Sequence, residues 1–193
     1  QLRNGTGPEN FDTRRFSRRW HFQRRSVSWT VTQNGTMEVK QFWEIVDRVH
    51  DNSGGVMDAK CELLSEELST LSDDDLRSFS RHFDTANVRA YSWPLWGAAH
   101  ILNGGCSDDS FSDFRSTLIS MGRRTFEKAL ADPNSLKDVE FDENHPCYEG
   151  FEYSVNTALE ERFGDLPPSE VEHPDEPSGK EWDEDTVESL YPD

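Results

Sequence analysis

Long hydrophobic runs are missing from this 193-residue sequence. No apolar stretch approaches the roughly 20 residues that a membrane-spanning helix needs. The N-terminal region also lacks the continuous apolar segment and the small-residue cleavage site of a secretory signal. We therefore expect no membrane association and a cytoplasmic location.

Cysteine is scarce as well. The three cysteines, Cys61, Cys106 and Cys147, are an odd number and include no C-x-x-C pair. This pattern indicates free thiols in a reducing compartment rather than a disulfide framework. The ligand spacings of the common metal sites are absent too, so we expect no metal and no cofactor.

Positive charge is rare outside the first 36 residues. The chain has 20 Lys and Arg against 38 Asp and Glu, a net charge of -18. Residues 1–36 carry a net +5, residues 37–164 a net -13 and residues 165–193 a net -10. An acidic body repels nucleic acid and anionic membranes, so for the main domain we expect no nucleic-acid binding. We expect the acidic surface to be a solvated one, with a site for a cation or a basic protein partner as the alternative.

Residues 1–36 differ in composition from the rest of the chain. They are rich in Arg, Ser and Trp and show no lasting helical or strand period, which predicts a disordered basic extension. Three explanations stay open. The segment is an arm that binds nucleic acid through arginines and stacked aromatic rings, an organelle transit peptide, or a piece foreign to the native protein, whose translation would start at Met37.

From Met37 to Gly164 apolar residues recur at helical spacing, and no segment alternates long enough to predict a strand. Thr36 is a candidate cap for the first helix, Ser72 with Asp75 predicts the start of another, and a last helix is expected from about Pro146 to Phe163. The predicted fold is all-α, a compact bundle-like domain of about six helices over residues 37–164.

The segment from Tyr91 to Gly122 says most about the architecture. Trp93 and Pro94 open an apolar helix, and Gly104-Gly105 supplies the left-handed residue that ends it. Ser107 is a good cap for the next helix, along which apolar residues recur at helical spacing. Two helices are therefore predicted to meet at a sharp corner.

The same segment resembles an uncharacterised bacterial family of unknown function, DUF 4240. The matching run is W-P-L-W-G-A-A-H-I-L-N-G-G-C-S-D-D-S-F-S-D-F-R-S-T-L-I-S-M-G, with an upstream match at Phe42, Trp43 and Ile45 and a downstream match at Trp182-Asp183-Glu184-Asp185. The resemblance extends over about residues 37–192. It implies no activity, cofactor or catalytic residue.

The candidate catalytic groups are His82, His100, Cys106, Asp108 and Asp109. Cys106 precedes a helix N-terminus, which favours a reactive thiolate; the two aspartates oppose it, and a small corner residue is the alternative. A metal site built from His100, Cys106 and one of these aspartates would have to span a helix end. His82 is equally explained as a hydrogen-bonded structural histidine.

A candidate binding pocket lies at the same corner. Its aromatic members are Tyr91, Trp93 and Trp96, beside His100, and its rim consists of Asn103, Asp108, Asp109 and Arg115. Large rings at a rigid corner suit a partner side chain or a small ligand. The alternative is that they form the core of a small bundle. For Asp108, Asp109 and Arg115, which span about two helical turns, we expect an ion pair or a cap rather than a general acid and base pair.

Residues 165–193 form an acidic, Pro-rich tail. Four apolar side chains interrupt its polar composition: Trp182, Val187, Leu190 and Tyr191. An exposed indole or phenol would forgo roughly 2 kcal/mol of burial. We therefore expect the tail to dock on its own domain through Trp182 and Tyr191, with capture by a partner as the alternative.

Two classes of function stay open. The first is a non-catalytic soluble binding or interaction module with an acidic surface, of the inhibitor or immunity type. The second is an enzyme of unrecognised type that uses the polar groups between Gly104 and Asp109. An enzyme needs its catalytic groups to converge in one concave site, and a binding module does not. No pattern in the sequence specifies an oligomeric state.

Overall fold

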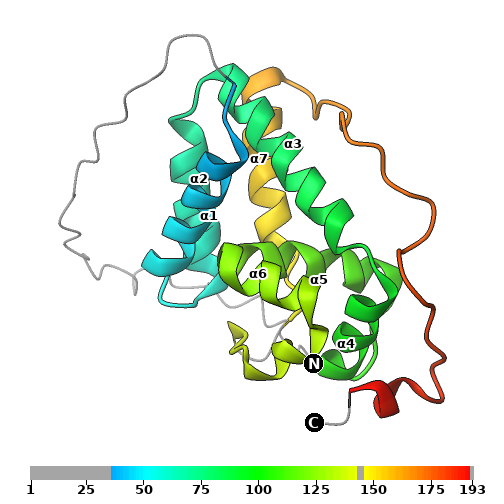
Figure 1. Ribbon diagram of the computed structural model, residues 1–193. Helices are drawn as coiled ribbons and strands as arrows, with labels where there is room; N and C mark the ends of the chain where they lie inside the picture. Colours follow the sequence, from blue (N-terminus) through cyan, green and yellow to red (C-terminus); the bar gives the residue numbers. More distant parts are fainter. Residues whose placement is uncertain (1–35, 143–145, 192–193) are drawn as a thin grey trace, which may run out of the picture. The chain divides into compact units, whose positions relative to one another are not determined.

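The computed structural model of the chain describes residues 36–142 and 146–191, and each regular element in them is a helix (Figure 1). The elements are α1 (Val39–Asn52), α2 (Met57–Ser69), α3 (Asp73–Ala90), α4 (Trp93–Asn103), α5 (Asp108–Ser120), α6 (Gly122–Ala131), the 3-10 helix η1 (Pro133–Asp138), α7 (Gly150–Phe163) and the 3-10 helix η3 (Val187–Leu190). The all-α prediction is confirmed. The basic extension predicted at residues 1–36 lies, apart from Thr36, outside the described residues.

Gly122 gives the described part of the chain one α-helix more than the six expected. Its φ of +85° is in the left-handed region, which breaks the helix between α5 and α6. Gly104 ends α4 in the same way, with φ +64°. At the start of α3, Ser72 Oγ accepts a hydrogen bond from the Asp75 amide at 3.2 Å, as the sequence predicts. None of the described helices has the length and apolar character to cross a bilayer.

Two helix starts differ from the prediction. α1 begins at Val39 rather than directly after Thr36, because the Glu38 amide donates to Gln41 Oε1 at 2.8 Å and so closes the first turn. α7 begins at Gly150 rather than near Pro146.

The delay of α7 has a tertiary cause. The Tyr148 amide donates to Thr117 Oγ1 at 2.8 Å, which holds the preceding segment against α5 in a non-helical form.

α5 is the central helix. It packs against α1, α3, α4, α6 and α7, and Figure 1 shows it lying across the ends of α1, α3 and α7. Every residue from Phe114 to Ser120 is buried, including small polar ones. Ser120 Oγ donates to the Thr117 carbonyl at 2.6 Å, and Thr117 Oγ1 accepts from the Tyr148 amide, whereas Ser116 Oγ is buried without a hydrogen-bond partner within the described residues. The sequence shows only the apolar stripe, since Ser and Thr are normally expected to face water.

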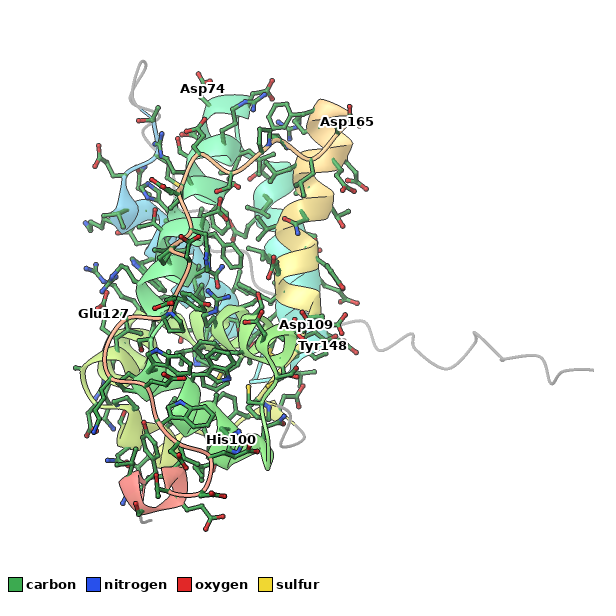
Figure 2. The ribbon with its side chains drawn as sticks, turned by 90° about the vertical axis from the view of Figure 1, so that its right-hand side faces the viewer. Asp74, His100, Asp109, Glu127, Tyr148 and Asp165 are labelled. Atoms are coloured by element: carbon green, nitrogen blue, oxygen red, sulfur yellow. The ribbon has the colours of Figure 1, made fainter. Side chains whose placement is uncertain are left out.

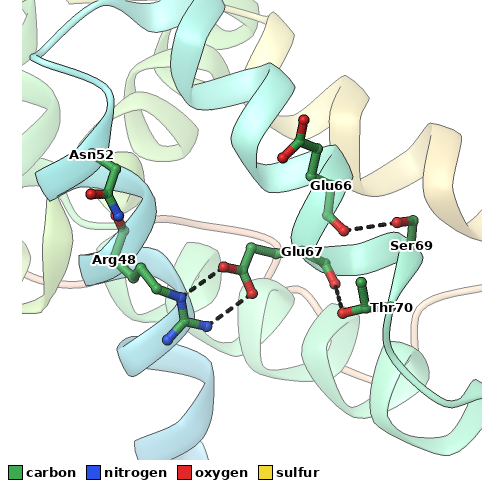
Figure 3. A network of polar contacts seen from close by, with 6 residues as sticks. All are labelled: Arg48, Asn52, Glu66, Glu67, Ser69 and Thr70. Atoms are coloured by element: carbon green, nitrogen blue, oxygen red, sulfur yellow. Dashed lines mark hydrogen bonds and ion pairs between the residues drawn. The ribbon is translucent and has the colours of Figure 1, made fainter. Parts of the chain in front are cut away.

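α1, α2 and α7 are tied together by two arginines. Arg48 of α1 binds Glu67 of α2 through two hydrogen bonds of 2.7 and 2.9 Å (Figure 3). At the far end of α7, Arg162 donates to the Ser69 and Leu71 carbonyls at 3.2 and 3.1 Å. α2 and α7 therefore lie side by side and run in the same direction.

The tail leaves α7 at Gly164 and runs along the domain toward α4. Figure 2 shows this path from Asp165 to the neighbourhood of His100. An isolated bridge fixes its middle part, where the Trp93 amide donates to the Ser178 carbonyl at 2.9 Å and the Ser178 amide donates to the Tyr91 carbonyl at 3.0 Å. The tail thus reaches the corner where the candidate binding residues lie.

Candidate functional site

Four aromatic rings stack in a row at the start of α4 and α5; we call them the aromatic corner. They are Tyr91, Trp93, Trp96 and Phe111. The Trp93 and Trp96 ring centroids lie 5.3 Å apart with planes at 7°, and those of Trp96 and Phe111 lie 4.9 Å apart, also at 7°. Pro94 fixes the first turn of α4, so two tryptophans three residues apart share one face.

The tail covers this corner. The Trp182 ring stands edge-on to Trp93 and Trp96, with centroids 6.0 and 6.3 Å away. The Tyr191 hydroxyl donates to the Pro94 carbonyl. Edge-to-face packing of this kind is favourable because the positive ring edge meets a negative ring face.

Gly97 makes room for the two tail rings. A Cβ at this position would lie 3.0 Å from Tyr191 and 3.1 Å from Trp182, closer than side chains ordinarily pack. Nearby, the Trp182 and His100 ring centroids are 5.1 Å apart. Within the described residues, Trp182 Nε1 and His100 Nδ1 are both buried without a hydrogen-bond partner. Because its rings face the chain's own tail, the aromatic corner is not an open pocket in this structure.

Arg115 lies beneath the corner rather than on its rim. The side chain is 7% exposed, and its guanidinium carbon is 4.8 Å from the centre of the Tyr91 ring. Nη1 donates to the Asn87 carbonyl and contacts His173 Nε2 of the tail, both at 3.2 Å. Burial lowers the pKa of Arg115.

The ion pair expected between Arg115 and the aspartates of α5 is therefore wrong. Asp108 and Asp109 are exposed in the first turn of α5, whereas Arg115 turns inward. Asn103, also expected on the rim, is exposed and donates to the nearby Gly105 carbonyl at 2.9 Å.

The candidate catalytic groups are not brought to one place. His82 Nε2 contacts the Met37 carbonyl at 2.9 Å, in the packing of α3 on α1, while His100 packs against Trp182. The Cys106 thiol has a third partner, the neighbouring Ser107 carbonyl at 3.7 Å. A shallow groove between α3, α7 and the tail is lined by residues such as Arg81 and Asp84 and contains none of the candidates.

Cys106 also has a cysteine, Cys147, as an electrostatic neighbour. The influence of Cys147 raises the pKa of Cys106, and that of Cys106 lowers the pKa of Cys147. The Trp96 indole donates to the Cys106 carbonyl at 3.0 Å and fixes that side of the pair. The sequence draws attention to Cys106 through its place before a helix, but nothing local connects it with Cys147, 41 residues away.

Lys60 is a buried ionisable residue that sequence reasoning missed. It is 0% exposed, and its Nζ donates to Ser120 Oγ at 3.3 Å and to the Met121 sulfur at 3.1 Å. Burial lowers its pKa from 10.5 to about 8. The available signal was its position, one helical turn after Met57 and one before Leu64 on the buried side of α2.

The exposed charged side chains of α2 and α7 are all negative. We call these two helices the acidic helix pair. The exposed carboxylates are Asp58, Glu62 and Glu66 on α2, Glu149 directly before α7, and Glu160 and Glu161 on α7. Figure 3 shows the Glu66 carboxylate turned away from Arg48. The two basic side chains of these helices do not lie among the exposed carboxylates: Lys60 is buried, and Arg162 binds backbone carbonyls and Asp73.

Across residues 36–142 and 146–191, no group of three His, Cys, Asp or Glu side chains is placed to hold a metal ion. Neither a curated protein nor a solved structure shows detectable similarity to the chain. A family of proteins of unknown function, DUF4240, matches residues 37–163, which include α1 to α7 and the aromatic corner but not the tail. The chain therefore belongs to the DUF4240 family.

Proposed function

We propose that this domain is a non-catalytic interaction module, of the inhibitor or immunity type, which binds a basic partner protein in the cytoplasm. The acidic helix pair is the proposed binding surface. The observation that carries the proposal is the single sign of the exposed charge on these two neighbouring helices. The three free cysteines support a reducing compartment.

The spacing of the acids suits a surface that meets a partner. Asp58, Glu62 and Glu66 recur every four residues, which places them one above another on α2. A one-sign surface attracts an oppositely charged partner over a Debye length and raises the association rate. Since Lys60 and Arg162 are directed inward or bound, they do not neutralise this field.

The enzyme alternative has less support. The side chains His82, His100 and Cys106 lie in different contacts, whereas catalysis requires such groups to converge. The aromatic corner, the other candidate surface, is covered by the tail. These two observations favour the acidic helix pair as the functional surface over an active site and over the aromatic corner.

The proposal is tested by reversing charge at two positions. The variant Glu62→Lys/Glu66→Lys changes the acidic helix pair, and the matched control Glu172→Lys/Glu176→Lys makes the same change of net charge at exposed tail positions. Each protein is immobilised and exposed to native lysate at low and at high salt, and bound proteins are identified by mass spectrometry. Affinity for the captured protein is then measured by calorimetry.

We expect the wild type and the tail control to capture the same basic protein at low salt. The helix variant should bind it about five- to thirtyfold more weakly, since two surface ion pairs contribute roughly 0.5 to 1 kcal/mol each. Equal losses in both variants would mean that only net charge matters. Unchanged binding in the helix variant would refute the proposed surface.

A further inference from the structure

The last part of the tail docks on one short stretch of the domain. We call residues 178–191 the docking segment. Its Ser178 forms the backbone bridge directly before α4, and its Trp182 ring packs on the α4 tryptophans. The Tyr191 hydroxyl donates to a carbonyl in the first turn of α4, and η3 lies against the same helix (Figure 1). Tyr91 and α4 together therefore form a receptor for the docking segment.

Apolar contacts rather than charges hold the docking segment. Its buried or half-buried side chains include Trp182, Val187 and Tyr191. Its carboxylates are exposed: Glu181, Asp183, Glu184, Asp185 and Glu188. Salt screens interactions between exposed charges but leaves apolar burial in place, so the docking should be insensitive to salt.

The fit between the docking segment and the aromatic corner leaves two polar atoms unpaired. Trp182 Nε1 and His100 Nδ1 are buried, and neither has a hydrogen-bond partner in the described part of the chain. Such atoms cost free energy when they are buried and regain hydrogen bonds when water reaches them. We therefore expect the docking to be reversible.

Residues 164–168 form a hinge between α7 and the tail. Gly164 ends α7 with φ +88°, in the left-handed region that glycine adopts at little cost. Pro167 and Pro168 favour an extended chain. Within the described residues, the first hydrogen bond of the tail beyond Gly164 is made by Ser169, whose Oγ donates to an α3 carboxylate at 2.6 Å. The tail can therefore leave α7 in another direction without disturbing a helix.

We propose that two copies of this chain pair by exchanging their tails, so that the docking segment of each copy occupies the aromatic corner of the other. The site specifies its occupant, because the space next to Gly97 is filled by one indole and one phenol, Trp182 and Tyr191. A second copy carries both rings at the required spacing. Every contact that the tail makes on its own domain is available on that copy, because the two domains are identical.

The concentration of the protein decides which form prevails. A segment tethered to its own domain has an effective concentration in the millimolar range. Single copies therefore dominate in dilute solution, and the exchanged pair accumulates as the protein concentration rises. This pairing does not use the acidic helix pair, so it is independent of the proposed binding of a basic partner.

The test combines two full-length variants that each retain one half of the contact. Trp182→Ala/Tyr191→Ala removes the rings of the docking segment and leaves the aromatic corner intact. Gly97→Leu fills the space of the two rings and leaves the tail intact. Sedimentation velocity measures each variant alone and an equimolar mixture at about 100 µM, well below the effective concentration of a tethered segment.

We expect each variant alone to be monomeric and the mixture to form a one-to-one complex at low and at high salt. In that complex the intact tail of Gly97→Leu occupies the intact corner of the other variant. The matched control is Gly97→Leu/Trp182→Ala/Tyr191→Ala, which lacks both halves and should form no complex with either variant. Wild type should show a dimer fraction that rises up to about 1 mM protein, and Glu62→Lys/Glu66→Lys should dimerise equally.

A second measurement needs no substitution at Gly97. A synthetic peptide of residues 176–191 should bind the Trp182→Ala/Tyr191→Ala protein in calorimetry. The same peptide with Trp182→Ala should bind at least about tenfold more weakly, because a buried tryptophan dominates contacts of this kind.

Two outcomes would overturn the proposal. One is a mixture that stays monomeric although circular dichroism shows that both variants are folded. The other is a peptide that does not bind the Trp182→Ala/Tyr191→Ala protein, since the aromatic corner would then not accept the docking segment from another molecule.

Discussion

The central helix α5 carries one buried cation, Arg115, and contacts a second, Lys60 of α2, and the two cations are held in different ways. Arg115, beneath the aromatic corner, contacts the Asn87 carbonyl, a tail histidine and the face of the Tyr91 ring. Lys60, at the C-terminal end of α5, has a serine hydroxyl and a thioether sulfur. Within the described residues neither makes an ion pair.

The difference teaches how side-chain chemistry decides the cost of a buried charge. A guanidinium spreads its charge over a plane, stacks on aromatic rings and offers several donors, so Arg115 keeps its charge under cover of the tail. An ammonium is a compact point charge, and thioether sulfur is a weak acceptor. Lys60 therefore titrates near neutral pH, with a pKa of about 8.

The largest effect is expected from Arg115→Lys, which places at the Arg115 site the same charged group that Lys60 carries. An ammonium cannot stack on Tyr91 and also reach both the Asn87 carbonyl and the tail, so the free energy of unfolding should fall by about 3 kcal/mol. Urea unfolding measures this change.

The matched control is Arg89→Lys. Arg89 binds Glu127 at the surface with an exposed fraction of 44%, and such a pair is worth about 0.5 kcal/mol. Losses of similar size in both variants would contradict the comparison, since burial would then not matter.

Lys60→Met should have the next largest effect and the opposite sign at neutral pH. Methionine fills a similar volume without a charge, so we expect the free energy of unfolding to rise by about 2 kcal/mol at pH 7.

The pH dependence supplies a sharper test of Lys60. Its pKa is about 8 in the folded protein against an ordinary 10.5, so between these values the unfolded chain binds more protons than the folded one. Stability of the wild type therefore rises with pH through this window, and the cost of the buried charge is complete below pH 8. Wild type and Lys60→Met should converge between pH 8 and 10; the control Lys128→Met, at an exposed site, should show a constant difference.

The smallest effect is expected from Gly97→Ala. This variant tests whether the tail packs on α4 and so covers the aromatic corner above Arg115. Because the new methyl group would collide with Tyr191 and Trp182, the free energy of unfolding should fall by about 1 kcal/mol. In a Trp182→Ala/Tyr191→Ala background the collision is gone, and the same change should stabilise α4 by about 0.5 to 1 kcal/mol through helix propensity. A destabilisation of equal size in both backgrounds would show that the tail does not pack on Gly97.

The helix boundaries show what local chemistry can predict. Ser72 and Gly104 act through their own backbone and their nearest neighbours, and each starts or ends a helix where the sequence predicts. The predicted start of α7 was wrong because a threonine on α5 holds Tyr148 in a non-helical form. No local sequence pattern encodes that contact.

The candidate site likewise has features that the sequence predicts and features that it does not. The stacking of Trp93 and Trp96 follows from their spacing on one helix beside Pro94. The inward turn of Arg115 does not, because it depends on α3 and the tail closing around the guanidinium. The carboxylates Asp108 and Asp109 are its neighbours in sequence but remain in solvent.

By itself, the sequence determined the all-α class, most helix ends, the family and the acidic balance of this protein, since each depends on composition or on contacts within about four residues. Only the tertiary structure decided that Lys60 is buried and that Arg115 lies under the aromatic corner. These outcomes depend on which segments pack around α5, and packing of residues distant in sequence follows from the free energy of the whole core rather than from any one stretch of chain.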